Sequence, residues 1–146
     1  MSTWTSRSFL FLQIVLSVAL AACIPFNSLD CPTLEEFYKS PGVAGPCGKA
    51  VAAEGSTVCV TGLIDWNNVL EQERKFTLTG SRYTIEVWVE TPQSREIFSR
   101  ILERKGDATR VAVRGTCVGF DMPVMGKCLR GVKIVLTSAG DLQFGQ

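Results

Sequence analysis

The chain has 146 residues and a mass of 15.9 kDa, which is the size of a single domain. Its 46% hydrophobic and 20% charged residues exclude a disordered or low-complexity protein. The 15 basic and 14 acidic residues nearly balance, which argues against a general nucleic-acid binder. The chain has no histidine, which excludes Ser-His-Asp and Cys-His catalysis and most zinc sites.

An apolar segment at residues 9–22 follows a polar start whose only charged side chain is Arg7. The segment is shorter than the roughly 20 residues that a membrane-spanning helix needs. It matches the hydrophobic region of a signal peptide, which we expect over residues 1–22. A buried core helix is the alternative, but the N-terminal position, the basic start and the small residues at the end favour the signal peptide.

The apolar segment ends in Leu20-Ala21-Ala22-Cys23, which resembles the lipobox of bacterial lipoproteins. The resemblance implies cleavage before Cys23 and acylation of its thiol and new amino group, by palmitate among other acyl chains. The protein would then be a lipoprotein of the cell envelope. No aspartate follows Cys23, which in the lipoprotein sorting pattern implies the outer membrane where a cell has two. Ordinary secretion is the alternative, because Ala19-Leu20-Ala21 is also a small-x-small cleavage site.

Lipidation and secretion leave different numbers of cysteines for disulfides. Secretion leaves all six, whereas lipidation uses Cys23 and leaves five, so that one thiol stays unpaired. Removal of Arg7 with the signal peptide leaves 14 basic and 14 acidic residues. The mature chain therefore has no polybasic patch for anionic lipid or nucleic acid. The acyl chains alone would supply the membrane affinity.

Residues 23–30 are expected to form a lipidated tether, and the seven residues after Cys23 span at most about 25 Å. A single domain is predicted over residues 31–146, and it would lie close to the membrane. It begins with a short helix that a capping box of Thr33 and Glu36 starts and that ends near Ser40.

Five β-strands, with one helix among them, are predicted after the short helix. Alternation of apolar and polar residues places the strands at residues 57–66, 75–79, 83–89, 110–116 and 132–137. The inward-facing residues of the third strand are expected to be Tyr83, Ile85, Val87 and Val89. The helix after it takes Thr91 as its N-cap. Its apolar stripe is Ile97, Phe98, Ile101 and Leu102.

This order predicts a mainly β protein, a five-stranded OB-like Greek-key barrel with the helix between strands three and four at one end. Val113–Phe120, followed by Gly126-Lys127-Cys128-Leu129, resembles the tRNA-anticodon-binding-like OB-fold families, and Val58–Gly62 fits their first strand. The likeness covers about residues 55–137. It implies the fold and a place among envelope proteins without an assigned activity, and it assigns no functional residue. The low basic charge departs from true anticodon binders.

The cysteines of an exported domain are expected to form disulfides. Cys117 and Cys128 flank a predicted loop, which a bond between them would shorten. Cys31 and Cys47 bracket the short helix, which needs a staple or packing to be stable. Cys59 would then be unpaired, and its pairing with Cys31 or Cys47 is the alternative. Neither a metal site nor a cofactor is expected, because the chain has no histidine and no Cys-x-x-Cys.

Trp88, Lys75 and Arg82 are the candidate ligand-binding residues. The outer face of the second and third strands is the usual binding face of an OB barrel, and a tryptophan with nearby cations can stack a base or a sugar. Packing of Trp88 under a loop or the short helix is the alternative. Glu86 and Glu90 on the same face would repel phosphate.

The remaining chemistry that the sequence offers is carboxylate chemistry. Paired acids can hydrolyse glycosides, but Asp65, Glu71, Glu73 and Asp121 lie in predicted loops without a catalytic partner. The sequence therefore predicts a lipid-anchored, non-enzymatic binding module for a protein or glycan partner. Single-stranded nucleic-acid binding and hydrolysis are the competing functions. A salt-dependent shift with an oligonucleotide would indicate the first, and a cleft of carboxylates with raised pKa would indicate the second.

Overall fold

The computed structural model of the protein describes residues 30–145. The signal segment, Cys23 and the tether up to residue 29 lie outside the described residues. The fold is mainly β, as predicted. Its elements in chain order are α1 (Leu34–Lys39), β1 (Gly45–Pro46), β2 (Thr57–Leu70), η3 (Glu71–Glu73), β3 (Lys75–Thr79), β4 (Thr84–Val89), α2 (Thr91–Leu102), β5 (Arg110–Val124), β6 (Lys127–Leu136), η4 (Ala139–Asp141) and β7 (Leu142–Phe144).

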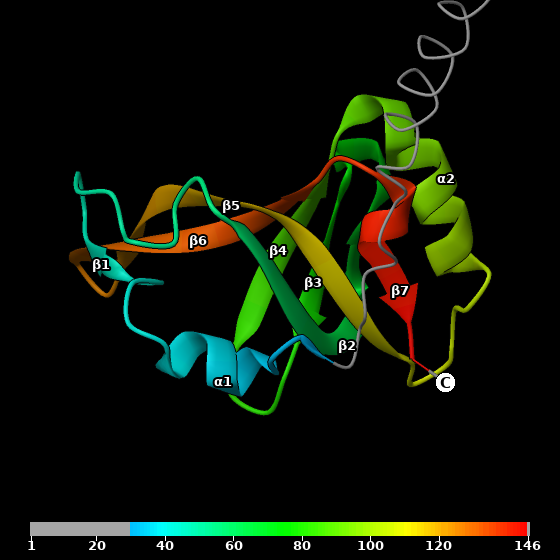
Figure 1. The fold of residues 1–146 in the computed structure, drawn as a ribbon, viewed down its shortest axis with the longest axis horizontal. Coiled ribbons are helices and arrows are strands. Elements are labelled where there is room, and N and C mark those ends of the chain that lie inside the picture. Colours follow the sequence, from blue (N-terminus) through cyan, green and yellow to red (C-terminus); the bar gives the residue numbers. More distant parts are fainter. Residues whose placement is uncertain (1–29, 146) are drawn as a thin grey trace, which may run out of the picture.

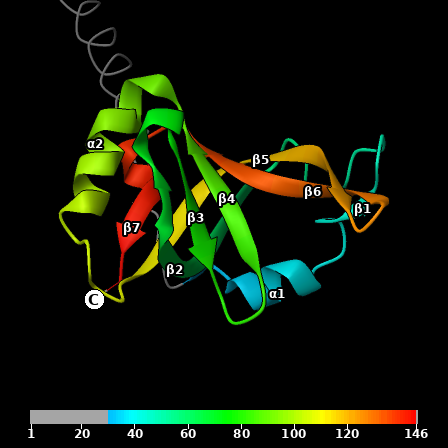
Figure 2. The same cartoon turned by 180° about the vertical axis from the view of Figure 1, so that it is seen from behind.

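The strands form one sheet in the order β1-β6-β4-β3-β2-β5-β7, and a further pairing of β5 with β6 joins β2, β3, β4, β6 and β5 in a ring (Figure 1 and Figure 2). Within the ring, β4 and β6 are parallel and the other pairs are antiparallel. β1 and β7 add to β6 and β5 outside the ring. The sheet is therefore not a clean five-stranded barrel.

Alternation along the strands points one side chain in two into the core. Among the fully or almost fully buried strand residues are Val60, Phe76, Leu78, Ile85, Val87, Val89, Val111, Val113, Ile134 and Leu136. Tyr83, which was expected among them, lies outside. β4 begins one residue later, and Tyr83 is 38% exposed. Its ring stacks on Tyr38 of α1 instead, with centroids 4.7 Å apart.

A glycine allows two strands of the ring to approach closely. A Cβ on Gly115 of β5 would lie 2.3 Å from the carbonyl oxygen of Val135 on β6. No side chain fits in that space, so only glycine lets β5 pass this close to β6 while both also pair with other strands.

α2 lies between β4 and β5, as predicted, and buries Ile97, Phe98 and Ile101 completely. The ring of Phe98 meets that of Phe76 edge-on at 6.2 Å. The expected burial of Leu102 is wrong, because it is 42% exposed. Leu102 is the last residue of the helix and lies about 140° around the axis from Ile97, so it turns away from the core.

The N-termini of the two helices differ in how well the sequence anticipates them. In α1 the capping box is present as predicted: Thr33 Oγ1 accepts from Glu36 N, and Glu36 Oε2 accepts from Thr33 N at 2.8 Å. In α2 the N-cap is Glu90 rather than Thr91, and it makes no side-chain cap hydrogen bond. The Thr91 hydroxyl instead accepts from the Arg74 guanidinium.

β5 and β6 are longer than predicted and form a hairpin that projects from the ring. The sequence between residues 117 and 131 is rich in glycine, which suggested a loop, yet these residues are almost all paired, out to Val124 with Lys127. Figure 1 shows this hairpin with β1 beside it at one end of the molecule, and α2 at the other end.

The disulfides join different cysteines from those predicted. Cys31 bonds to Cys59 and Cys47 bonds to Cys128, whereas Cys117 is free and buried. The predicted bond between Cys117 and Cys128 is wrong because the segment between them is strand. Cys117 pairs with Ile134 in β6, six residues from Cys128, which separates the two cysteines by about 20 Å.

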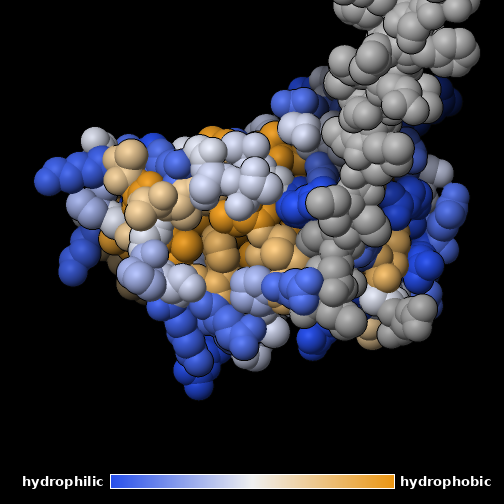
Figure 3. All heavy atoms as spheres, viewed as in Figure 1, coloured by the Kyte–Doolittle hydropathy of each residue, from blue (hydrophilic) through white to orange (hydrophobic). Residues whose placement is uncertain are grey.

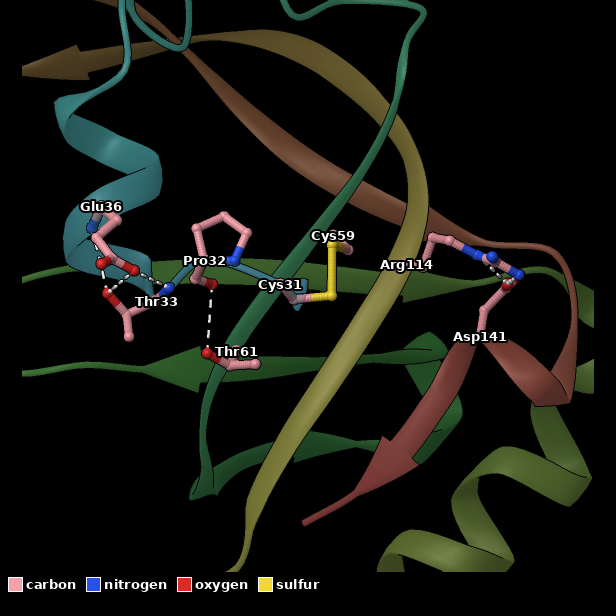
Figure 4. The surroundings of a disulfide bond; sticks show 8 residues. All are labelled: Cys31, Pro32, Thr33, Glu36, Cys59, Thr61, Arg114 and Asp141. Atoms are coloured by element: carbon pink, nitrogen blue, oxygen red, sulfur yellow. Dashed lines mark hydrogen bonds and ion pairs between the residues drawn. A yellow bond between two sulfur atoms is a disulfide. The ribbon is translucent and has the colours of Figure 1, made fainter. Parts of the chain in front are cut away.

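The alternative pairing of Cys59 with Cys31 is confirmed, and it clamps the start of the described chain to β2 (Figure 4). Next to the bond, the Pro32 carbonyl accepts from Thr61 N at 2.8 Å and from the Thr61 hydroxyl at 3.3 Å. The predicted bond between Cys31 and Cys47 is therefore wrong. The Cys31–Cys59 bond holds α1 on β2 from the N-terminal side of the helix, and Cys47 bonds to Cys128 of the hairpin instead.

Candidate functional site

The strongest candidate for a binding site is the outer face of β3, β4 and β6 around Trp88. Trp88 lies between the buried Val87 and Val89, so alternation turns it outward. Lys75 of β3 is its direct partner across the antiparallel pair. Val135 of β6 is its partner on the parallel side.

Two lysines from the neighbouring strands lie over the Trp88 indole. Lys133 Nζ is 3.7 Å and Lys75 Nζ 5.4 Å from the ring centroid. The indole N–H donates to Glu86 Oε2 at 2.9 Å. We call Trp88, Lys75, Lys133 and Glu86 the Trp88 surface. Its lysines occupy positions over the indole at which a ligand ring would stack, and cation–π attraction holds them there.

The two lysines differ in charge balance. Lys75 Nζ lies 3.0 Å from Glu73 and 3.8 Å from Glu86, and the hydrogen bond with Glu73 raises the lysine pKa. Lys133 forms no ion pair within residues 30–145. Lys133 is therefore the cation of the Trp88 surface that can pair with an anionic group of a ligand.

The structure brings Trp88 and Lys75 together but places Arg82 elsewhere. Arg82 lies in the turn before β4, six residues from Trp88, and its N–H donates to Glu35 Oε1 at 3.2 Å. Lys133 was not predicted from the sequence as part of this surface. Its place between the buried Val132 and Ile134 could have shown that it faces outward, but not that β6 lies beside β4.

A shallow hollow of about 360 Å³ adjoins the Trp88 surface. Its lining includes Arg74, Trp88, Glu90, Thr91, Pro92 and Val135. Arg74 has a φ of +56°, which directs the chain from η3 into β3. The hollow offers a polar rim beside an aromatic ring, which suits a sugar or another small polar group.

Several carboxylates form ion pairs and hydrogen bonds that stabilise the fold. Arg130 of β6 binds both Glu54, with Nη2 to Oε2 at 2.9 Å, and Asp121, with Nη1 to Oδ1 at 2.9 Å. This contact with Arg130 lowers the Glu54 pKa to about 2. Hydrogen bonds from Ser81 and from Thr33 lower the pKa of Glu35 and Glu36. These shifts are opposite to the raised pKa of a general acid.

The Glu54 pKa predicts a loss of stability in acid. Because the folded pKa of about 2 lies below the ordinary value of 4.5, Glu54 stabilises the fold fully above pH 4.5 and loses this contribution as the pH falls towards 2. We expect Glu54→Gln to reduce the dependence of the unfolding free energy on pH in that window. Chemical denaturation at several pH values measures it, with Glu96→Gln on α2 as the matched control. Equal acid dependence in wild type and Glu54→Gln would contradict the prediction.

Within residues 30–145, no group of three His, Cys, Asp or Glu side chains could hold a metal ion. No helix in the same residues is long and apolar enough to cross a membrane. A scan against known protein families matches none of them, and a search of curated proteins finds no match.

Proposed function

We propose that this chain is a lipid-anchored envelope protein whose OB-type barrel is a non-enzymatic binding module. Two features of the pairing support an OB topology. The ring follows the order β2-β3-β4-β6-β5, and its parallel pair joins the third strand to the fifth. In chain order, α2 lies between the third and fourth strands of the ring, β4 and β5, where the OB fold has its helix.

The Trp88 surface is the proposed binding site. The observation that carries the proposal is that Lys75 and Lys133, from the two neighbouring strands, both lie at the Trp88 indole. A glycan with acidic groups fits it best. Lys133 can pair with a carboxylate or phosphate, while the hollow beside the indole accepts the sugar ring. Glu73 and Glu86 leave too little net positive charge for a polyanion such as RNA.

Binding to acidic oligosaccharides tests the proposed site. We expect Lys133→Ala to weaken binding of a uronic-acid oligosaccharide about tenfold or more, because a hydrogen bond to a charged group contributes about 1.5–3 kcal/mol. Trp88→Ala should weaken it by a similar factor, because Trp88 lines the hollow and holds Lys133 in place by cation–π attraction. Calorimetric titration of the full chain measures both, with Lys39→Ala on α1 as control. Equal affinity in wild type and both variants would exclude this surface. Salt-dependent binding of an oligonucleotide, lost in Trp88→Ala, would favour nucleic acid instead.

Acylation of Cys23 is the second testable part of the proposal. We expect the protein expressed with residues 1–22 to incorporate labelled palmitate and to partition into detergent. Cys23→Ser removes the thiol that accepts the acyl chain, so labelling should be lost and cleavage blocked. Cys117→Ser, which also removes one thiol, should label normally. Palmitate labelling of the Cys23→Ser protein would contradict the lipid anchor.

A further inference from the structure

The β5–β6 hairpin presents one apolar and one polar face. Strand alternation and the β5–β6 register place Met122 with Leu129, and Val124 with Lys127, on one face. Asp121 with Arg130, and Pro123 with Cys128, belong to the other face. The polar face also receives Glu54, which bonds to Arg130 at 2.9 Å.

The apolar face is open to solvent at its end. Met125 is fully exposed, Leu129 is 45% exposed and Val124 is 38% exposed. These are three of the six large hydrophobic residues that are exposed within residues 30–145, and they fall within six positions of the chain. We call Met122, Val124, Met125 and Leu129 the hairpin tip. Figure 3 shows hydrophobic and hydrophilic residues side by side at this end of the molecule.

The turn contains an unusual residue at its most exposed position. Met125 and Gly126 connect Val124 to Lys127, and both have positive φ, +48° and +76°. Such turns favour asparagine, aspartate or glycine at the first of these positions. Methionine is disfavoured in this conformation, and its fully exposed side chain gains no packing within the fold. Within residues 30–145 no contact compensates for this unfavourable conformation of Met125, which points to a contact outside these residues.

The charges around the hairpin tip favour a negatively charged surface. The two acids at this end, Glu54 and Asp121, are both bound to Arg130 on the polar face. Lys127 adjoins the tip and Lys49 lies in the segment after β1, and neither forms an ion pair within residues 30–145. Unpaired lysines beside exposed aliphatic side chains are the composition of segments that lie at a membrane interface.

The disulfide arrangement gives the hairpin a fixed position and reach. Cys47–Cys128 ties β1 to the hairpin close to its turn. Cys31–Cys59 fixes the start of the domain on β2, opposite Arg114 of β5, ten residues from Val124. The tip therefore lies at most about 33 Å along β5 from that start. A tether of at most about 25 Å from Cys23 allows the tip and the anchor to reach one bilayer.

We propose that the hairpin tip inserts into the interface of a bilayer that contains anionic lipid, with Lys127 and Lys49 at the headgroups. The contact would orient the barrel and its Trp88 surface relative to the membrane. It rests on the envelope location proposed above but not on a ligand at Trp88. A convex tip with a fully exposed methionine suits insertion into lipid better than docking into a protein groove.

Oxidation of Met125 by chloramine-T, a charged oxidant that stays in water, tests the insertion in the full chain. The protein is reconstituted into vesicles of phosphatidylcholine and phosphatidylglycerol, and the oxidation rate is compared with that of the denatured chain. We expect a slowing of about tenfold on these vesicles and less on phosphatidylcholine alone. Lys127→Gln should lower about fivefold the ratio of molecules whose Met125 is covered by lipid to molecules whose Met125 is not covered. Lys39→Gln on α1 should leave it unchanged.

The apolar contribution is tested by the Val124→Asp/Leu129→Asp double variant, which should restore the oxidation rate of the denatured chain. Leu63→Asp, at an exposed position on β2, is the matched control, and recovery of the Cys47–Cys128 peptide verifies the fold. A wild-type Met125 rate on vesicles equal to the denatured rate would overturn the proposal. Slowing that appears only in envelope extract would overturn it in favour of a protein partner.

The same samples separate the hairpin from the anchor. Palmitate labelling and flotation with the vesicles report on Cys23. If the labelled protein floats with the vesicles but its Met125 is oxidised as fast as in the denatured chain, the protein has the anchor and lacks the hairpin contact. Slowed Met125 oxidation in the Cys23→Ser protein on the same vesicles supports the hairpin contact without acylation.

Discussion

Replacement of Cys47 and Cys128 by serine is expected to lower the free energy of unfolding by about 4.5 kcal/mol, because this disulfide closes a long loop in the unfolded chain. The two cysteines are 81 residues apart in sequence. The shorter loop of Cys31–Cys59, with a separation of 28, gives about 3.6 kcal/mol by the same relation. The Cys47–Cys128 bond also ties β1 to the projecting hairpin, so its loss should loosen residues 41–55 before the ring unfolds.

Chemical denaturation of the wild type and of the two double variants measures these differences. Peptide mapping without reductant should recover Cys31–Cys59 and Cys47–Cys128 peptides and a free Cys117. The Cys117 thiol should resist alkylation until the fold opens, because burial raises its pKa to about 11. Recovery of a Cys117–Cys128 peptide would contradict the pairing described here.

Phe98→Ala is expected to destabilise the protein by about 3–5 kcal/mol, because it removes a completely buried ring and leaves a cavity. The ring packs edge-on against Phe76 of β3, so its loss uncouples α2 from the ring of strands. Ile101→Ala on the same face should cost about 2–5 kcal/mol.

Leu102→Ala is the matched control for the α2 variants, because it changes the neighbouring residue of the same helix where the side chain is 42% exposed. We expect it to change the unfolding free energy by less than about 0.5 kcal/mol. Urea denaturation of the full chain compares the three. A cost for Leu102→Ala equal to that of Ile101→Ala would mean that α2 is rotated from the orientation described.

Features that depend on neighbours in sequence were predictable. The capping box of Thr33 and Glu36, the position of α2 and the inward direction of Ile85, Val87 and Val89 in β4 follow from chemistry within a few residues. In each case the contacts that stabilise the element are local, or the core selects apolar residues with the period of that element. The error at Leu102 comes from the end of a helix, where the apolar stripe no longer meets the core.

The amino-acid sequence by itself determined the mainly β character, the place of the helix among the strands and the outward direction of Trp88. The tertiary structure decided the partners of Cys31, Cys47 and Cys59, the length of the β5–β6 hairpin and the position of Lys133 over the Trp88 ring. The reason is that disulfides and strand pairs join residues far apart in sequence. Glycine and proline between residues 117 and 131 resemble a loop locally, and only pairing between β5 and β6 makes these residues strand.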